Sequence, residues 1–170
     1  MNVADLLVDG FSRVKGTVHA AVEGLTAEQL ATRLDPRANS IAWLVWHLTR
    51  VQDDHVADVA GTEQVWTGQD WLSRFGLPFP AGDTGYGHRA ADVEAVHVDK
   101  PDLLTGYYDA VHEQTVRFIT GLGDEALDRI VDEGWNPPVS LGVRLVSVLD
   151  DDIQHAGQAM FVRGVLERGH

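Results

Sequence analysis

Apolar residues recur every three or four positions in four long stretches of the chain, which is the period of an amphipathic α-helix. The first stretch, from about Val3 to Val22, carries a stripe made of Leu6, Leu7, Phe11, Val14, Val18 and Val22. A short helix from about Ala27 to Arg33 is predicted next, because Thr26 and Gln29 have the spacing of a capping box. The turn-like letters LDPRAN follow, so the next helix begins after them.

Two more long helices are predicted in the middle of the chain. The first covers residues 40–61, where Asn39 or Ser40 can cap the start and Gly61 suits the position after the last turn. The second opens at Pro101, because proline is favoured at the first helical position, and the glycines of residues 121–123 would end it. Strand-like alternation of apolar and polar residues is nearly absent from the sequence.

The last predicted helix runs from near Ser140 to about Glu167. Its seam positions are spaced by four and three, which is typical of a helix in a bundle. Two of these positions are polar, because the series reads Leu141, Leu145, Val148, Asp152, His155, Ala159, Val162 and Leu166. Polar groups in a seam need partners, so this segment is the first place to look for a site.

A long stretch from Thr62 to Asp99 separates the second and third long helices, and it is rich in glycine, proline and aromatic residues. Connections of this length are often functional, and they allow the flanking helices to run parallel. The chain is therefore predicted to be all-α, a four-helix bundle with a long crossover loop between helices two and three. We expect residues 1–170 to form a single domain.

The composition removes several classes of function. The net charge of the 170 residues is −13, with 26 acidic and 13 scattered basic residues, so no nucleic-acid partner is expected. No run of apolar residues is long enough for a membrane span, and the N-terminus lacks the pattern of a secretory signal. The absence of cysteine excludes disulfides, thiolate metal ligands and a cysteine nucleophile, and it agrees with a cytoplasmic protein.

The segment DDDIQH, residues 150–155, is the strongest candidate for chemistry. Asp151 and His155 are four residues apart, so they lie on one face of a helix and could bind one metal ion. Asp152 and His155, three apart, are an alternative pair. His47 is the best third ligand, because it lies beside an apolar stripe that points into the bundle. The competing interpretations are a solvated acidic face and a buried, neutral histidine.

Other polar residues have weaker assignments. We expect His55 to be exposed or near the mouth of the site. His88, in a glycine-rich part of the loop, could reach a ligand or lie on the surface. Arg163 could pair with a substrate carboxylate or with an acidic residue of a neighbouring helix. The aromatic candidates for a pocket wall, with core packing as the alternative, are Trp43, Trp46, Trp66, Trp71, Phe75, Phe79 and Tyr86.

Four segments carry a resemblance to a known family, and together they cover most of the chain. They read NSIAWLVWHLTRVQDDH, WTGQDWLSRFGLPFPAGDTGYGH, GYYDAVHEQT and VSLGVRLVSVLDDDIQHAGQAMFVRG. The chain resembles the DinB superfamily, and more closely its actinobacterial branch that includes mycothiol-dependent maleylpyruvate isomerase-like proteins. The histidine of the second helix and the QHAG run with its trailing RG are the specific parts.

The resemblance implies a four-helix bundle that holds a divalent metal, often zinc or nickel, through one histidine of the second helix and two residues of the fourth helix. Those positions are His47, Asp151 and His155 in this chain. The aspartate departs from the three-histidine pattern of many members, but a carboxylate stands there in the maleylpyruvate isomerase-like branch. This ligand set suits zinc and leaves iron or manganese open. Asp152 would then face solvent or support the ligands.

The resemblance also implies an activity, since in such relatives the metal activates a small thiol such as mycothiol. We expect a metal-dependent transferase or isomerase whose partners are a small-molecule substrate and an external low-molecular-weight thiol. A non-catalytic bundle that binds a metal or ligand, and a metal-dependent hydrolase, are the alternatives. The sequence leaves the oligomeric state open, with a homodimer as one option.

Overall fold

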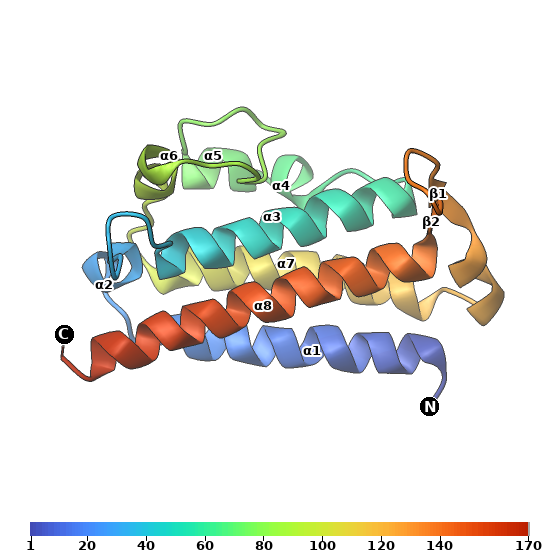
Figure 1. Ribbon diagram of the computed structural model, residues 1–170, viewed down its shortest axis with the longest axis horizontal. Coiled ribbons are helices and arrows are strands. Elements are labelled where there is room, and N and C mark those ends of the chain that lie inside the picture. The colour runs from blue at the N-terminus through green and yellow to red at the C-terminus, as the bar shows by residue number, and fades with distance from the viewer. Residues whose placement is uncertain (170) are drawn as a thin grey trace.

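Four long helices lie side by side in the computed structural model, which describes residues 1–169 (Figure 1). The long helices are α1 (Val3–Val22), α3 (Ile41–Ala60), α7 (Pro101–Thr120) and α8 (Leu141–Glu167). The prediction of an all-α, four-helix bundle is therefore confirmed. No helix within the described residues combines the length and the apolar character that a membrane crossing needs.

Shorter elements connect the long helices. A five-residue helix precedes α3, three short helices lie in the crossover segment, and a 3-10 turn and a small antiparallel hairpin lie between α7 and α8. The elements are α2 (Ala27–Ala31), α4 (Val65–Gly68), α5 (Trp71–Phe75), α6 (Ala90–Ala95), η1 (Asp124–Asp128), β1 (Ile130–Asp132) and β2 (Val139–Ser140). The crossover thus contains local helical structure that the sequence pattern did not predict.

The helix ends follow from side-chain caps. Ser40 and Ser140 cap α3 and α8, because each hydroxyl accepts a hydrogen bond from a backbone N–H of the first turn. Thr26 and Gln29 form the predicted capping box, with both reciprocal hydrogen bonds present. Gly61 ends α3 in the left-handed conformation, at φ 66°. These caps place the ends of α3 and α8 close to where the sequence predicted them.

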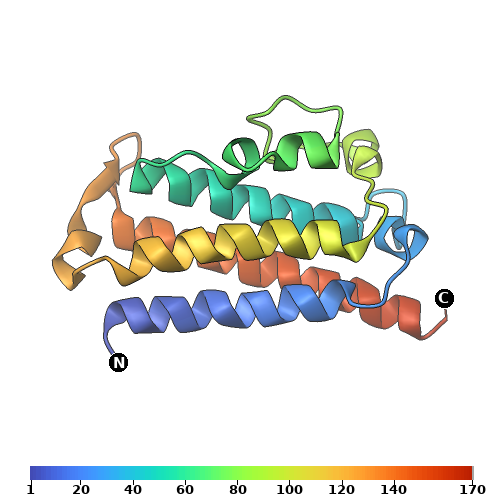
Figure 2. The ribbon, with the colours of Figure 1, turned by 180° about the vertical axis from the view of Figure 1, so that it is seen from behind.

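The arrangement of the long helices brings the two candidate ligand segments together. Helix α1 packs against α7 and α8, and α3 packs against the same two helices. Figures 1 and 2 show that α3 and α7 run in the same direction, which the long crossover makes possible. Because α3 and α8 are neighbours, His47 on one helix can meet Asp151 and His155 on the other.

The core consists mainly of the predicted apolar stripes. In α1 the residues Leu7, Phe11, Val14, Val18 and Val22 are buried, whereas Leu6, which the prediction included, is 58% exposed. Leu6 and Leu7 are adjacent, and adjacent residues of a helix point about 100° apart, so only one of them can face the core. The crossover segment contributes buried aromatics to the same core, including Trp66, Trp71 and Phe75.

Two buried charged residues of α3 fasten the crossover segment to the bundle. The guanidinium of Arg50 donates to the carbonyl oxygen of Asp83 at 3.1 Å and to the amide oxygen of Gln64 at 2.9 Å. The carboxylate of Asp53 accepts hydrogen bonds from the backbone N–H groups of Val65 and Trp66, both at 2.8 Å. The start and the middle of the crossover are therefore bonded to one turn of α3, just beyond His47.

Candidate metal centre

His47, Asp151 and His155 converge on one point between α3 and α8. Each offers a ligand atom, and these atoms all lie within 4.8 Å of one another. His47 is buried, and the other two residues are half-buried. The rings of His47 and His155 meet edge to face, with their centroids 4.7 Å apart. The alternative pair, Asp152 with His155, is not part of this cluster.

The orientation of His47 is set by the crossover segment. Its Nδ1 lies 2.5 Å from the carbonyl oxygen of Thr84. A carbonyl can only accept, so Nδ1 carries the proton and Nε2 presents a lone pair. The indole of Trp43 stacks on the other side of the ring at 4.5 Å. The imidazole is therefore fixed as a neutral Nε2 ligand, in the manner of metal-binding histidines whose second nitrogen donates to a carbonyl.

Gly85 makes this contact with the loop possible. A Cβ atom at this position would lie 2.8 Å from Nδ1 of His47 and 3.0 Å from the ring of Trp46. The residue also has φ +90°, a backbone conformation that side-chain-bearing residues rarely adopt. Only glycine therefore allows the backbone of the crossover to lie directly on the histidine.

The second imidazole is oriented in the same way. Nδ1 of His155 donates to the backbone carbonyl of Asp151, one turn earlier in α8, at 2.9 Å. Its Nε2 is consequently the nitrogen with the free lone pair. Burial lowers the pKa of His47, and proximity to His155 lowers it further. Burial also opposes protonation of His155, but the Asp151 carboxylate and carbonyl outweigh it and raise the pKa of His155.

The carboxylate of Asp151 supplies a buried oxygen that has no protein donor. Its Oδ2 lies 3.3 Å from Nδ1 of His155, but that proton is directed to the backbone carbonyl. No donor within residues 1–169 completes a hydrogen bond to this oxygen. Burial raises the pKa of Asp151, but the adjacent His155 and His47 outweigh it, so the pKa is lowered. The group is thus an ionised carboxylate with an unused lone pair.

This set of donors fits a divalent metal. Two Nε2 lone pairs and one carboxylate oxygen are the ligands of catalytic zinc sites, which keep a further position open for water or substrate. A metal ion would also give the buried Oδ2 of Asp151 the partner that it lacks within the described residues, since buried polar atoms in proteins normally have one. The same ligands accept iron or manganese, so the donor set alone does not name the metal.

Asp152 does not face solvent, so the first of the two roles expected for it was wrong, and the second, support of the ligands, stays a prediction. Its side chain is completely buried, and both carboxylate oxygens lack a hydrogen-bond donor within the described chain. Burial, followed by the charge of Asp151, raises the pKa of Asp152 well above its usual range. Burial, followed by the charge of Asp152, in turn raises the pKa of Tyr108 of α7. Asp152 therefore belongs to the interior of the bundle, on a different face of α8 from Asp151.

His88 is not part of the candidate cluster, and its side chain is buried and not on the surface. Its side chain is 7% exposed. Nδ1 accepts a hydrogen bond from the indole N–H of Trp43 at 3.0 Å, so Nε2 carries the proton and donates to the carboxylate of Asp83. Because Trp43 stacks on His47, the hydrogen bonds from Asp83 through His88 to Trp43 help to hold the ring of His47 in place.

Arg163 also lies away from the cluster. It donates to the carbonyl oxygens of Ala20 and Glu23 at the end of α1, at 2.7 Å each, and to Glu167 of its own helix at 2.8 Å. The expected acidic residue of a neighbouring helix is not among these partners. The side chain instead satisfies backbone carbonyls that the end of α1 leaves unpaired.

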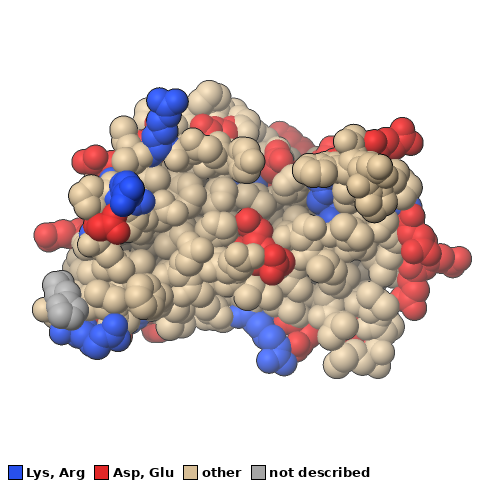
Figure 3. Space-filling model, viewed as in Figure 1, with Lys and Arg blue, Asp and Glu red and all other residues tan. Residues whose placement is uncertain are grey.

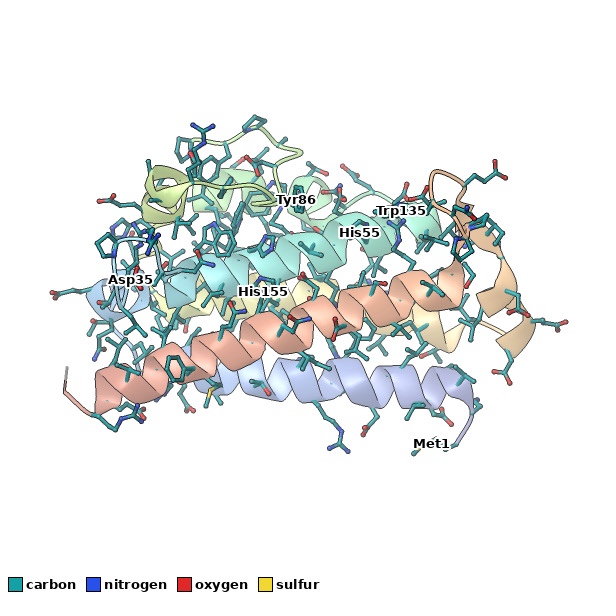
Figure 4. The ribbon with its side chains drawn as sticks, viewed as in Figure 1. Met1, Asp35, His55, Tyr86, Trp135 and His155 are labelled. Carbon is teal, nitrogen blue, oxygen red and sulfur yellow. The ribbon has the colours of Figure 1, made fainter. Side chains whose placement is uncertain are left out.

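A cavity of about 690 Å³ opens from the candidate metal centre along the groove between α3 and α8. Its lining includes His47 and Asp151 of the cluster, together with His55, which is half-buried and not exposed. Of the predicted wall aromatics only Tyr86 takes part, and Trp135 of the hairpin joins it. Figure 4 shows Tyr86, His55 and Trp135 along the same stretch of α3, with His155 on the facing helix.

The other predicted aromatics are in the core or anchor the crossover segment. Trp43, Trp46, Trp66, Trp71 and Phe75 are buried, and Phe79 packs against the same cluster. Sequence reasoning missed Thr84, Gly85, Arg144 and Trp135, which shape the ligand or the cavity. A glycine-rich DTGYG run was visible, but nothing in it indicated which histidine it would contact.

Comparisons with known proteins agree with the fold. A family model described as mycothiol-S-transferase matches residues 6–168. A crystal structure of a conserved protein from Enterococcus faecalis is similar over 96% of both chains, with 29% sequence identity and a TM-score of 0.90. No curated protein matches the chain. Lysine and arginine side chains are scattered over the face drawn in Figure 3 and do not gather into a patch.

Proposed function

Because this chain belongs to the mycothiol-S-transferase family, we propose that it is a metal-dependent enzyme that transfers an external low-molecular-weight thiol to a small electrophile. The observation that supports this most is the convergence of His47, Asp151 and His155 at the wall of an open cavity. A thiol that cells keep reduced in the cytoplasm is the natural reagent for such an enzyme, so we place its activity there.

The two imidazoles and the Asp151 carboxylate would hold the metal, with zinc as the first expectation and nickel, iron and manganese as the alternatives. A divalent metal in such a site lowers the pKa of a thiol that binds it and so supplies a thiolate nucleophile at neutral pH. The chain contains no cysteine, so the sulfur must come from a second molecule. The cavity has room for both reactants beside the ligands.

The residues around the cluster have separate tasks. The backbone carbonyl oxygens of Thr84 and Asp151 accept hydrogen bonds from Nδ1 of His47 and of His155, respectively. These bonds keep the Nε2 atoms of both rings directed at the metal position. The backbone at Gly85 covers His47 and excludes water from that side. In the net reaction a carbon–sulfur bond forms, the thiol proton passes to solvent, and the electrophile gives up its leaving group.

The test is thiol transfer by the purified protein, before and after removal of metal with a chelator. Mycothiol and monobromobimane would be mixed with each sample, and the conjugate would be measured by liquid chromatography with fluorescence detection. We expect turnover above the uncatalysed rate, its loss after chelation, and its return when zinc or another divalent ion is added. A rate equal to the background for every added metal would overturn the proposal and leave a non-catalytic bundle.

A further inference from the structure

Apolar side chains are exposed along the outer face of α8, the side of the helix that is turned away from the bundle core. They are Val143, Val146, Ile153, Met160 and Phe161, each between 37% and 64% exposed. Figure 1 shows α8 at the front of the bundle, with no other element over it. Val146, Ile153 and Met160 are seven residues apart, which is the repeat of a helix that packs against another helix. No element within residues 1–169 supplies that second helix.

The charged residues of α8 avoid the middle of this face. Residues 153–162 contain no aspartate, glutamate, lysine or arginine, although the net charge of the chain is −13. In Figure 3, which has α8 in front, most of the surface over this helix is accordingly tan. Contiguous apolar surface of this kind is characteristic of a contact with another molecule, since monomeric proteins seldom leave it open. The charges at its two ends indicate which molecule.

The two ends of this uncharged segment carry opposite charges. Asp150 precedes it and Arg168 follows it, and both residues are exposed. Within residues 1–169 the ion pairs of α8 involve Arg144, His155 and Arg163, and they leave these two residues free. A face with an acidic and a basic end is complementary to itself when two copies lie antiparallel. A second copy of this chain is therefore the partner that the charges favour.

The shape of the face selects the same antiparallel pairing and gives its register. Phe161 projects from the helix and is 64% exposed, whereas Gly157, one turn earlier, leaves open space, with no atom within 4 Å of a Cβ built there. The ring of one copy can therefore pack over the glycine of the other. This contact puts a two-fold axis level with Ala159, and the same axis brings Asp150 of one copy opposite Arg168 of the other.

A different register would bury more apolar surface but would leave a charge without a partner. With the axis at residues 153–154, Val146 would face Phe161 of the second copy. Asp150 would then face Gly157, and no basic side chain would lie opposite it. Removing a carboxylate from water without a cation is costly, so the charges favour the first register.

We propose that the outer face of α8 is the interface of a symmetric dimer, in which the α8 helices of two copies lie antiparallel with the two-fold axis at Ala159. The overlap, residues 150–168, is about 28 Å long. A contact between two helices is smaller than the standard interface of about 800 Å² per partner, so the dissociation constant should be micromolar. Val143, which lines the cavity, lies outside the overlap, so the cavity stays open in the dimer.

The first arm of the test measures the dissociation constant of the dimer by sedimentation equilibrium. Phe161→Ser and Val146→Ser are matched variants, because both residues are exposed on the outer face but only Phe161 lies in the overlap. We expect wild type and Val146→Ser to dimerise equally, and Phe161→Ser to raise the dissociation constant at least about tenfold. A wild type that is monomeric throughout the micromolar range would overturn the proposal and leave the face to another protein or a lipid surface. Equal effects of the two variants would also contradict it.

Charge exchange tests the pairing of the two ends. Asp150→Arg and Arg168→Asp should each weaken the dimer, because each substitution places like charges opposite one another. The double variant should restore the dimer, since its two charges are exchanged but still opposite in sign. A double variant that dimerises as weakly as the single variants would contradict the antiparallel register.

The absence of cysteine makes the register directly measurable. Met160→Cys would lie roughly 3 Å from its counterpart along the helix axis, so mild oxidation should link the two copies. Ile153→Cys, roughly 18 Å from its counterpart, should stay unlinked. A disulfide-linked dimer from Ile153→Cys but not from Met160→Cys would indicate the other register and overturn this one.

Discussion

Replacing Gly85 by alanine tests the contact between the crossover segment and His47, and the chain supplies its own control. Gly85 and Gly87 both have positive φ, +90° and +77°. A Cβ atom at Gly85 would lie 2.8 Å from Nδ1 of His47, whereas at Gly87 no atom lies within 4 Å. Both substitutions therefore strain the backbone, but only Gly85→Ala pushes on the candidate ligand.

The magnitudes follow from these two contributions. A left-handed backbone costs a residue with a side chain about 1–2 kcal/mol, and this is the expected destabilisation for Gly87→Ala. Overpacking against buried rings adds about 1–3 kcal/mol, so Gly85→Ala should lose about 2–5 kcal/mol in total. If the ring of His47 moves, its bond to Thr84 is lost as well, and metal affinity should fall about 10–100-fold, as for other partners of metal ligands.

Two measurements on each variant separate these effects. Urea unfolding of the metal-free proteins gives the free energy of unfolding, and competition with a chromophoric chelator gives the zinc affinity. We expect Gly87→Ala to show only the smaller loss of stability, with wild-type zinc affinity. Equal zinc affinities for Gly85→Ala and Gly87→Ala would refute the reasoning that the loop holds His47 in place.

Three other substitutions test separate parts of the structure. Asp53→Ala should cost about 3–5 kcal/mol in urea unfolding, because it leaves the buried Arg50 without its acidic neighbour and frees the crossover segment; a loss below 1 kcal/mol would contradict this. Asp152→Asn should stabilise the metal-free protein at pH 7. The raised pKa means that folding takes up a proton, so wild-type stability falls as the pH rises above the unfolded value of about 3.9. The advantage of the variant should therefore shrink towards pH 4, and an advantage that grew there would be the wrong sign. Arg163→Met should cost about 1–3 kcal/mol through the lost hydrogen bonds to α1, with no change in the KM for thiol or electrophile; a raised KM would restore a role in substrate binding.

The long helices were predictable because their signals are local. Periodic apolar residues and the caps at Thr26, Ser40 and Ser140 are properties of neighbouring positions, and a cap bonds within its own turn. The parallel course of α3 and α7 was also accessible, since it follows from the length of the segment between them. The fold class therefore needed no knowledge of which side chains meet across the bundle.

The details of the site depended on contacts between distant residues. The spacing of Asp151 and His155 identified one side of the cluster, and the apolar stripe beside His47 made it the best third ligand. The family resemblance then implied Asp151 and not Asp152 as the carboxylate. Nothing local showed that Thr84 would orient His47, since these residues meet only after the crossover has folded back on α3. Arg50 appeared to be an ordinary basic residue of a helix, although its partners lie in the segment that follows.

Asp152 shows how a sequence pattern can be right and its interpretation wrong. The apolar periodicity of α8 put Asp152 in the seam, and the structure buries it completely. The solvent-facing alternative, one of the two roles expected for Asp152, is therefore excluded, although burying a carboxylate without a partner is generally costly. Asp152 is nevertheless buried without a donor within the described residues, in the helix that also carries two of the candidate metal ligands.

The most direct test of the central claim is the metal content of the purified protein, measured by elemental analysis on wild type and three variants without a histidine tag. The variants are His47→Ala, His155→Ala and, as a control, His112→Ala, whose histidine is half-buried outside the cluster. We predict about one divalent ion per chain in the wild type and in His112→Ala, and its loss in the other two. No bound metal in the wild type after incubation with zinc, nickel, iron or manganese, or equal metal in all four proteins, would contradict the account.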